Sequence, residues 1–466
     1  MPNKNASFLR PYYHLTAATG RINDPNGVYI EGNLLHCYFQ TDPMWPLATK
    51  RTGWGHAYTK LEAAKPEAWV HLPDALAPTV DYDDRGCYSG SAVLVDGELE
   101  LFYTGNSKPG GNRRATQNLV HVSDRLTEDS VSFNQTGGSH RRSSLNPLID
   151  GPAEGYTNHY RDPQITLRDG VWTMILGAQR VDETGAAVLY TSTDRRTWNF
   201  KGEITFDLTN AQPGGAPDLI PGGYMWECPN LVTLHDEVRG EDLDILIFLP
   251  QGLEPQGFHY ANNHQCGYVV GKLEGTTFHV LRGFTELDHG FEFYAPQVAF
   301  NNSNPAIPPV MIGWLGLPDQ DDQPSKDEHW MHTLTLIREL SLKDLHLYQY
   351  PRAVLPTAPE LGVHDAEFEM TPGSAVNLLD ANGKTAMTVS LDEERVLKLD
   401  RSGQNYHTDV DFRAVKLPET HKPTVHVVRI IVDASTVEVY VNGGSIAAAS
   451  RIYPDTAIIA LEVQDK

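Results

Sequence analysis

The chain has 466 residues, of which 40% are hydrophobic and 21% charged, and its formal net charge is −23. A single hydrophobic core stops growing near ~250–300 residues, so this length predicts two domains. The negative charge argues against nucleic acid and against an anionic membrane surface as partners, because both attract lysine and arginine.

The N-terminal residues Met1 to Arg10 contain no apolar core of a signal peptide. No apolar run along the chain approaches the ~18 residues that a membrane span needs. The four cysteines stand singly, at Cys37, Cys87, Cys228 and Cys266, which is typical of reduced thiols. Together these features predict a cytoplasmic location.

Five times along the chain, a short polar motif precedes an alternating apolar run, a turn and a second apolar run. We name these motifs the openers; they are Asn23-Asp-Pro-Asn-Gly27, Ser89-Gly-Ser91, Arg161-Asp-Pro163, Glu227-Cys-Pro229 and Tyr294-Ala-Pro296. Alternating runs around Asp-Gly, as at Asp96-Gly97 and Asp169-Gly170, are typical of β-hairpins. Each opener therefore precedes an expected pair of strands.

The openers recur at a nearly constant spacing. With one residue taken from each, the intervals between them are 65, 73, 65 and 67 residues, counted over Asp24, Ser89, Asp162, Glu227 and Tyr294. A constant period of hairpins predicts a five-bladed β-propeller over roughly residues 10–340. The alternative is a set of unrelated hairpins in a sandwich. In a propeller the first strands begin around the central channel, so the five openers would line one funnel.

The pattern changes after Gln349-Tyr-Pro-Arg352. Pro356, Pro359 and Gly362 indicate a linker, and alternating runs at 425–432 and 437–441 predict a β-sandwich. We therefore expect an all-β chain with a propeller domain at 1–345, a linker at 346–362 and a β-sandwich domain at 363–466.

Three openers carry a carboxylate, at Asp24, Asp162 and Glu227. Glycoside hydrolysis needs two carboxyl groups beside the bond that breaks, and their environments must keep one charged and the other protonated. Each of these residues alone is more simply explained as a turn former or a surface pair. Their equivalent position in a repeat is what favours a catalytic site.

The neighbours of each carboxylate suggest its role. Asp24 lies in an Asn-Asp-Pro turn whose backbone N–H groups would keep it ionised, which suits a nucleophile. Glu227 follows Met225 and Trp226, and apolar surroundings favour a neutral acid because desolvation raises a carboxyl pKa. Asp162 stands beside Arg161 and is expected to hold the hydroxyl groups of a sugar ring.

Other kinds of chemistry have little support in the sequence. The 19 histidines are scattered without the spacing of metal ligands. The chain also has neither a glycine-rich phosphate loop nor a GxSxG motif. We therefore expect no metal and no cofactor, and a small sugar as the partner; whether the chain forms a homo-oligomer is left open.

The chain resembles glycoside hydrolase family 32, which includes invertases, sucrose-6-phosphate hydrolases and fructan hydrolases. The segment Arg21 to Gly27 is similar to the family's W-M-N-D-P-N-G, Arg161-Asp-Pro163 to its R-D-P, and Glu227-Cys228 to its E-C. Further matching segments are Trp54-Gly-His56, Tyr88-Ser-Gly-Ser91, Phe293-Tyr-Ala-Pro-Gln297, Arg338-Glu-Leu-Ser341 and Val432-Asp-Ala-Ser-Thr-Val-Glu438. The matches follow one another in order over most of the chain.

The resemblance implies a five-bladed propeller with a C-terminal β-sandwich and a reaction that retains configuration. Asp24 would be the nucleophile, Glu227 the acid/base, and Asp162, with Arg161 beside it, the stabiliser of the transition state. The positions that contact the fructosyl unit would be Asn23, Gln40, Tyr88, Ser89 and Trp314.

The expected function is a β-fructofuranosidase that hydrolyses sucrose, sucrose 6-phosphate or short fructo-oligosaccharides through a fructosyl-enzyme. A fructosyltransferase and a non-catalytic sugar-binding propeller are the alternatives. Arg21-Ile22 replaces the family's usual Trp-Met, and the loop from Met44 to Thr52 lacks the family's tryptophan at its expected spacing, so the leaving group stays open. Four residues offer local positive charge for a phosphate ester: Lys50, Arg51, Arg113 and Arg114.

Overall fold

The computed structural model describes residues 8–61, 67–262, 264–301, 304, 307–408, 410–417 and 425–464. Within these ranges the chain is nearly all β, which confirms the expected all-β class. The exceptions are three short 3-10 helices, η1 at Pro109–Gly111, η2 at Pro324–Glu328 and η3 at Pro359–Leu361. Among the described residues, no helix is long and apolar enough to cross a membrane.

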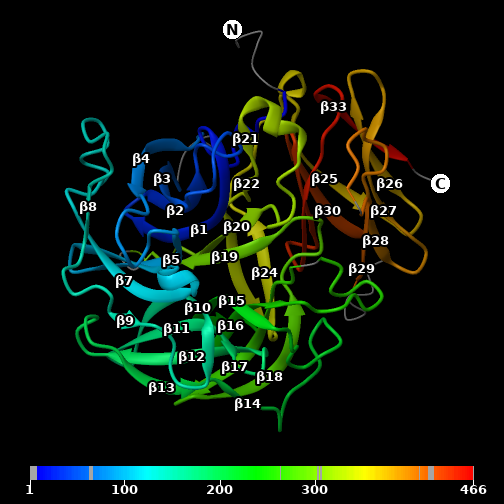
Figure 1. Cartoon of the computed structure of the whole chain (residues 1–466). Coiled ribbons are helices and arrows are strands. Elements are labelled where there is room, and N and C mark those ends of the chain that lie inside the picture. Colours follow the sequence, from blue (N-terminus) through cyan, green and yellow to red (C-terminus); the bar gives the residue numbers. More distant parts are fainter. Residues whose placement is uncertain are drawn as a thin grey trace.

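The first three sheets follow the chain order (Figure 1). The first contains β1 (Gly20–Glu31), β2 (Leu34–Asp42), β3 (Gly53–Lys60) and β4 (Val70–Leu76), and β21 (Trp330–Met331) pairs in parallel with β1. The second contains β5 (Gly86–Val95), β6 (Glu98–Ser107), β7 (Arg114–Ser123), β8 (Ser139–Arg142) and β9 (Ile149–Asp150). The third contains β10 (Tyr156–Arg168), β11 (Val171–Arg180), β12 (Gly185–Ser192) and β13 (Asn199–Glu203).

The next sheet has ten strands in two groups. One group is β14 (Thr205–Asp207), β15 (Met225–Asp236), β16 (Glu241–Gln251), β17 (Gly267–Glu274) and β18 (Thr277–Glu286). The other is β19 (Tyr294–Ala299), β20 (Val310–Leu315), β22 (Thr333–Leu334), β23 (Arg338–Lys343) and β24 (His346–Pro351). The groups join through one residue pair, Asp236 of β15 beside Leu342 of β23.

The strands that carry the openers form a closed ring. Strand β1 contacts β5 and β19, β5 contacts β10, β10 contacts β15, and β15 contacts β19. A polar side chain on each of these strands accepts a hydrogen bond of 3.2–3.3 Å from a backbone N–H of the next. The bonds are Gly90 to Asn26, Ile165 to Ser91, Leu231 to Gln164, Val298 to Asn230, and Val28 to Gln297. Five segments far apart in the sequence thus meet around one axis.

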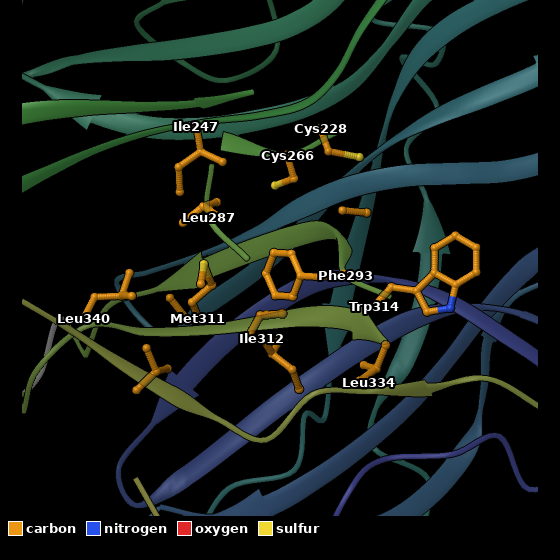
Figure 2. Packing of buried hydrophobic residues seen from close by; sticks show 14 of the residues in the cluster. Cys228, Ile247, Cys266, Leu287, Phe293, Met311, Ile312, Trp314, Leu334 and Leu340 are labelled. Atoms are coloured by element: carbon orange, nitrogen blue, oxygen red, sulfur yellow. The ribbon is translucent and has the colours of Figure 1, made fainter. Parts of the chain in front are cut away.

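The apolar alternation of these strands fills the space between neighbouring sheets. One cluster of buried residues draws on β1 and β2 and on the strands from β15 to β23. Figure 2 shows part of it, with Met311 and Ile312 between Leu340 on one side and Trp314 on the other, and Ile247 above them. Sheets buried against each other in this way hold the openers at fixed positions.

Two further antiparallel sheets follow η3. One has the order β25 (Val363–Met370), β30 (His426–Asp433), β31 (Thr436–Val441) and β32 (Ile446–Arg451). The other has the order β29 (Phe412–Lys416), β28 (Val396–Asp400), β27 (Thr385–Leu391), β26 (Ala375–Asp380) and β33 (Ile458–Gln464). Residues of both, such as Leu378, Val389, Ile430 and Val439, belong to one buried cluster. The two sheets therefore share a core.

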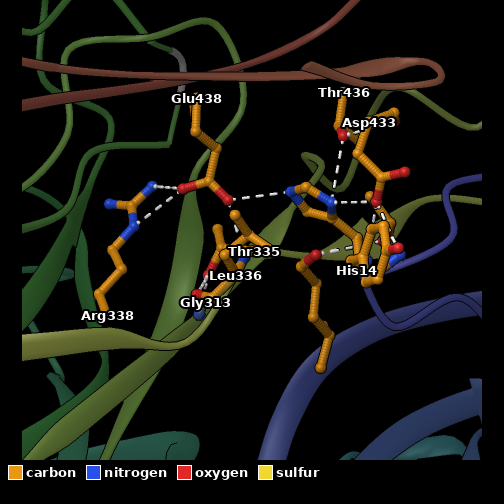
Figure 3. A network of polar contacts seen from close by, with 12 residues as sticks. His14, Gly313, Thr335, Leu336, Arg338, Asp433, Thr436 and Glu438 are labelled. Atoms are coloured by element: carbon orange, nitrogen blue, oxygen red, sulfur yellow. Dashed lines mark hydrogen bonds and ion pairs between the residues drawn. The ribbon is translucent and has the colours of Figure 1, made fainter. Parts of the chain in front are cut away.

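A buried ionic network ties the sheet of β30 and β31 to the earlier part of the chain (Figure 3). The ring of His14 lies 2.8 Å from an Asp433 oxygen and 3.0 Å from a Glu438 oxygen. Arg338 donates to Glu438 at 2.7 Å and to Asp288 at 2.9 Å. Burial acts to lower the pKa of His14, but the hydrogen bonds that the ring donates to Asp433 and Glu438 outweigh it and raise the pKa to about 9. We call these five residues the His14 network.

Candidate active site

The site is built on a repeated irregularity at the openers. In each of the five ring strands, the pairing with the next strand is interrupted at the opener. The interruptions fall between Ile22 and Pro25, Cys87 and Gly90, Arg161 and Gln164, Glu227 and Asn230, and Tyr294 and Gln297. Three of the five contain a proline between these bounds, and in the first Pro25 ends the interruption; proline suits a bulge because it has no N–H for the ladder. A bulge bends the strand and redirects its side chains.

Asp24 lies at the first bulge and is half-buried. One of its oxygens accepts a hydrogen bond from the Ser89 hydroxyl and a longer one, 3.4 Å, from Gln40 Nε2. The other accepts one of 3.2 Å from Asn23 Nδ2. Gln40 also bonds to Ser89 at 2.6 Å and accepts from Asn23 at 2.5 Å. The structure thus brings Asn23, Gln40 and Ser89 together around Asp24.

These contacts correct one expectation. The donors to the Asp24 carboxylate are side chains, not the backbone N–H groups of its turn. Burial, with a further contribution from the charge of Glu227, raises the pKa of Asp24, and the Ser89 hydrogen bond opposes this. The hydrogen bonds keep the carboxylate oriented for reaction.

Asp162 lies at the third bulge, where its φ is 67°. Its side chain is buried and accepts a hydrogen bond of 3.0 Å from the backbone N–H of Cys228. The Cys228 sulfur lies 3.6 Å from the same oxygen and 3.9 Å from Asp24 Oδ2. Asp24 and Asp162 therefore face a common neighbour. Burial raises the pKa of Asp162, although the charge of Arg161 opposes it.

Glu227 is held by more donors than either aspartate. Arg161 binds one of its oxygens through Nε at 2.9 Å and also through Nη2. The other oxygen accepts hydrogen bonds from the Tyr294 hydroxyl at 2.6 Å and from Gln251 Nε2 at 2.5 Å. Three strands, β10, β16 and β19, thus direct donors at this one carboxylate.

The argument that apolar neighbours keep Glu227 neutral is therefore wrong for the ligand-free protein. Burial does act to raise the pKa of Glu227. The charge of Arg161 and the hydrogen bonds from Tyr294 and Arg161 outweigh burial, and the pKa is lowered. Met225 and Trp226 precede Glu227 in the chain, but the side chains that bind its carboxylate come from other strands.

Two predicted residues flank this group. Trp314 of β20 pairs with Tyr294 across the strands, and the guanidinium of Arg21 lies 5.1 Å from the centre of its ring. Tyr88 stands at the second bulge, where its hydroxyl accepts a hydrogen bond of 3.3 Å from Asn106. Neither side chain forms a hydrogen bond with the three carboxylates, all of which lie in the described part of the chain.

Sequence analysis missed Gln251, and it gave Tyr294 no role beyond marking the fifth opener. The position of Tyr294 at the fifth opener could have indicated that it belongs to the site, because equivalent positions of the repeat lie close together. No sequence feature pointed to Gln251. Within the residues that the structure describes, no group of three or more histidine, cysteine, aspartate or glutamate side chains is arranged to hold a metal ion.

Three buried carboxyl groups from different strands, joined by one arginine and one cysteine, make a site suited to the cleavage of glycosidic bonds. Two family models match the chain: the N-terminal domain of glycosyl hydrolases family 32 over residues 14–351 and the C-terminal region of that family over residues 378–466. The chain belongs to glycosyl hydrolase family 32.

Relatives and solved structures agree. A sucrose-6-phosphate hydrolase of Bacillus subtilis is 33% identical over 480 residues, covering 97% of this chain and 91% of its own. A solved sucrose-6-phosphate hydrolase of Lactobacillus gasseri superimposes with a TM-score of 0.78 at 25% identity, over 99% of this chain and 91% of its own. A mutant of the Bombyx mori family 32 beta-fructofuranosidase, in complex with sucrose, superimposes with a TM-score of 0.75 at 26% identity, over 98% and 93%.

Proposed function

We propose that this chain is a retaining β-fructofuranosidase that hydrolyses the fructosyl bond of sucrose, sucrose 6-phosphate or short fructo-oligosaccharides. In this proposal Asp24 is the nucleophile, Glu227 the acid/base, and Asp162 the group that holds fructose hydroxyls. The observation that carries it is the convergence of these three carboxylates at equivalent bulges of the ring. The names and substrates of the family 32 relatives support the β-fructoside as substrate.

The roles follow from what each carboxylate can still do. Asp24 attacks the anomeric carbon, and the bond from this carbon to the leaving oxygen breaks. Glu227 gives its proton to that oxygen and later takes a proton from the water that releases fructose. Asp162 already accepts a backbone hydrogen bond from Cys228, so its remaining lone pairs suit sugar hydroxyls better than proton transfer.

We also infer a five-bladed propeller followed by a β-sandwich. The closed ring of β1, β5, β10, β15 and β19, and the single residue pair between the two groups of the ten-stranded sheet, support five blades. We keep the division into a propeller domain, a linker and a sandwich domain, but with a later start for the linker. The expected linker was 346–362, and its first residues form β24 (His346–Pro351), which pairs with β23 of the propeller part. The four free cysteines favour a reducing compartment such as the cytoplasm.

The decisive experiment compares Asp24→Ala and Glu227→Ala on sucrose and on an aryl fructoside with a good leaving group. Asp24→Ala removes the covalent route, so kcat should fall by at least about 10³-fold on both substrates. Glu227→Ala removes proton donation, worth about 10²–10⁴-fold on sucrose, and its loss should be much smaller on the aryl fructoside. Recovery of Asp24→Ala by the good leaving group would reverse the assignment.

A product assay on sucrose separates hydrolysis from transfer. Free fructose in equal amount to glucose is the expected result, with the anomeric configuration of fructose retained at first release. Fructosyl-sucrose products in place of free fructose would make the protein a transferase with the same intermediate. Binding of sucrose without any product would contradict the catalytic proposal.

A further inference from the structure

Arg113 lies beside the site but belongs to none of the contacts described so far. It stands in the loop between β6 and β7, directly before β7, and is half-buried. Its guanidinium carbon is 5.7 Å from the centre of the Tyr88 ring. Burial lowers the pKa of Arg113, and the charge of nearby Arg161 lowers it further, while Tyr88, Glu227 and Asp162 act in the opposite direction. The charge of Arg113 therefore interacts with those of Glu227 and Asp162.

The other local cations are all held by protein groups. Arg161 binds Glu227, Lys50 binds Asp321 at 2.5 Å, and Arg114 binds Asp150 at 2.7 Å. Arg51 donates to the Pro78 carbonyl at 2.7 Å.

Arg113 differs from them. Within the described part of the chain, its guanidinium has neither a hydrogen bond nor an ion pair, and its Nε atom is fully buried without a partner. A half-buried cation without an anion costs stability, and such groups are concentrated at functional sites.

Two polar side chains near Arg113 also have a hydrogen-bonding atom without a partner among the described residues. Asn106 is 5% exposed and donates to the Tyr88 hydroxyl, but its side-chain oxygen is buried without a partner. Buried polar atoms without partners are rare in folded proteins and call for an explanation.

His159 supplies the other group. Its Nδ1 lies 3.1 Å from Arg161 Nη1. Burial and the charges of Arg161 and Arg113 lower the pKa of His159 to about 4. The ring is then neutral at pH 7, its Nδ1 accepts from Arg161, and its Nε2 carries the proton. Arg113 and His159 Nε2 are two donors that form no hydrogen bond with any described residue.

We propose that Arg113 determines specificity for the leaving sugar by binding a phosphate monoester on it. This inference rests on the proposed function, in which Glu227 protonates the leaving oxygen and the leaving sugar therefore lies on the Glu227 side. Arg113 lies against the Tyr88 ring, and its charge interacts with Glu227 although no ion pair between the two is formed among the described residues. A guanidinium fork matches phosphate oxygens, and its charge would offset the repulsion that a chain of net charge −23 exerts on a dianion.

The test measures kcat/KM for sucrose and for sucrose 6-phosphate in wild type, Arg113→Gln, Arg113→Lys and the matched control Arg114→Gln. A charge-assisted hydrogen bond is lost in Arg113→Gln, so the ratio of sucrose 6-phosphate to sucrose kcat/KM should fall by about 10- to 100-fold. Arg113→Lys keeps the positive charge but loses the planar guanidinium, so its ratio should lie between those of wild type and Arg113→Gln. Arg114→Gln should keep the wild-type ratio, because Arg114 already binds Asp150.

Thermal unfolding separates a structural role from a binding role. Because Arg113 has no protein anion, Arg113→Gln should unfold at the wild-type temperature or above it. An equal loss of kcat/KM on both substrates would show that Arg113 acts through Glu227 or through the fold, and an unchanged ratio would show that it does not touch the phosphate. Either result overturns the inference while the proposed function stands.

Binding measurements keep the inference testable if the proposed function fails. Titration of Glu227→Ala with sucrose 6-phosphate and with sucrose, followed by calorimetry, requires no turnover. Tighter binding of the phosphate ester, lost in the double variant Glu227→Ala/Arg113→Gln, supports the role of Arg113. Equal affinity for both sugars overturns it. Failure of the wild type to cleave either sugar would count against the proposed function alone.

Discussion

The pKa of Glu227 and the pKa of Asp24 are each shifted against the direction that the proposed role of the residue requires. The pKa of Glu227 is lowered chiefly because Arg161 and Tyr294 outweigh burial, and the pKa of Asp24 is raised chiefly by burial. The proposed reaction needs Glu227 protonated and Asp24 ionised. Both shifts therefore act against the active ionisation state. Because the pKa of Glu227 is moved down and that of Asp24 up, we expect the acidic limb of the kcat/KM profile to follow Glu227 and the alkaline limb to follow Asp24.

Tyr294→Phe tests this assignment. The variant loses the 2.6 Å hydrogen bond to the ionised Glu227 carboxylate, so the pKa of Glu227 should rise. The acidic limb of the kcat/KM profile on sucrose should move to higher pH, while the alkaline limb should stay in place. A shift of the alkaline limb alone would show that Glu227 controls the alkaline limb and Asp24 the acidic limb, which would reverse the assignment. Tyr348→Phe, on β24 outside the ring, is a control that should leave both limbs unchanged.

The sequence was enough to identify the three carboxylates, because they stand at equivalent places in a repeat that is visible in the residues. It could not give the ionisation of Glu227. That property depends on Arg161, Tyr294 and Gln251, which approach from three other strands. The same limit applies to Arg113: the sequence marks it as one of four cations, and only the structure shows that Lys50 and Arg114 are bound to carboxylates while Arg113 is not.

At the scale of the strands, the Asn230 side chain links β15 to β19 through several hydrogen bonds rather than one. Its Oδ1 accepts the Val298 N–H at 3.3 Å, and its Nδ2 donates to the Cys228 and Pro296 carbonyls at 3.0 Å each. One side chain thus connects its own bulge with the next strand. The alternation of apolar residues predicted the strands themselves, but it could not predict a ring of hydrogen bonds made by the polar residues between them.

We expect Asn230→Ala to lower the free energy of unfolding by about 2–5 kcal/mol, because it leaves three buried backbone groups without their partner. Urea unfolding followed by tryptophan fluorescence measures this. Asn199→Ala on β13 is the matched control, because Asn199 is exposed, and its effect should stay within about 0.5 kcal/mol. Equal stability of the two variants would show that the ring bonds do not stabilise the fold.

At the scale of the whole molecule, the His14 network joins the N-terminal segment to the C-terminal sheet that contains β30 and β31. Burial and the charges around it set its pH dependence. The pKa of His14 is raised to about 9, so the stability that it contributes is complete below its unfolded value near ~6.5 and is lost as pH rises through 9. The pKa of Glu438 is lowered to about 2 by Arg338 and His14 against burial, so its contribution is lost as pH falls from ~4.5 toward 2.

His14→Gln should therefore cost about 3–5 kcal/mol of unfolding free energy near pH 6, where the buried pair is intact in the wild type. The difference between variant and wild type should shrink as pH rises through 9. His235→Gln is the control: its pair with Asp242 is exposed, with 60% and 72% of the two side chains accessible, and should contribute less than about 1 kcal/mol. A difference that does not change with pH would show that His14 is not charged in the native state.

The pairing of β1 with β21 has a consequence for the order of events during synthesis. The Gly20 N–H donates to the His329 carbonyl at 2.7 Å, and the Leu334 N–H donates to the Leu15 carbonyl at 2.8 Å. The first sheet is therefore completed by residues that leave the ribosome some 300 positions after it began, and contacts of such large sequence separation form slowly. Until then β1, which carries Asp24, keeps an open edge that a chaperone has to shield or a neighbouring chain can join.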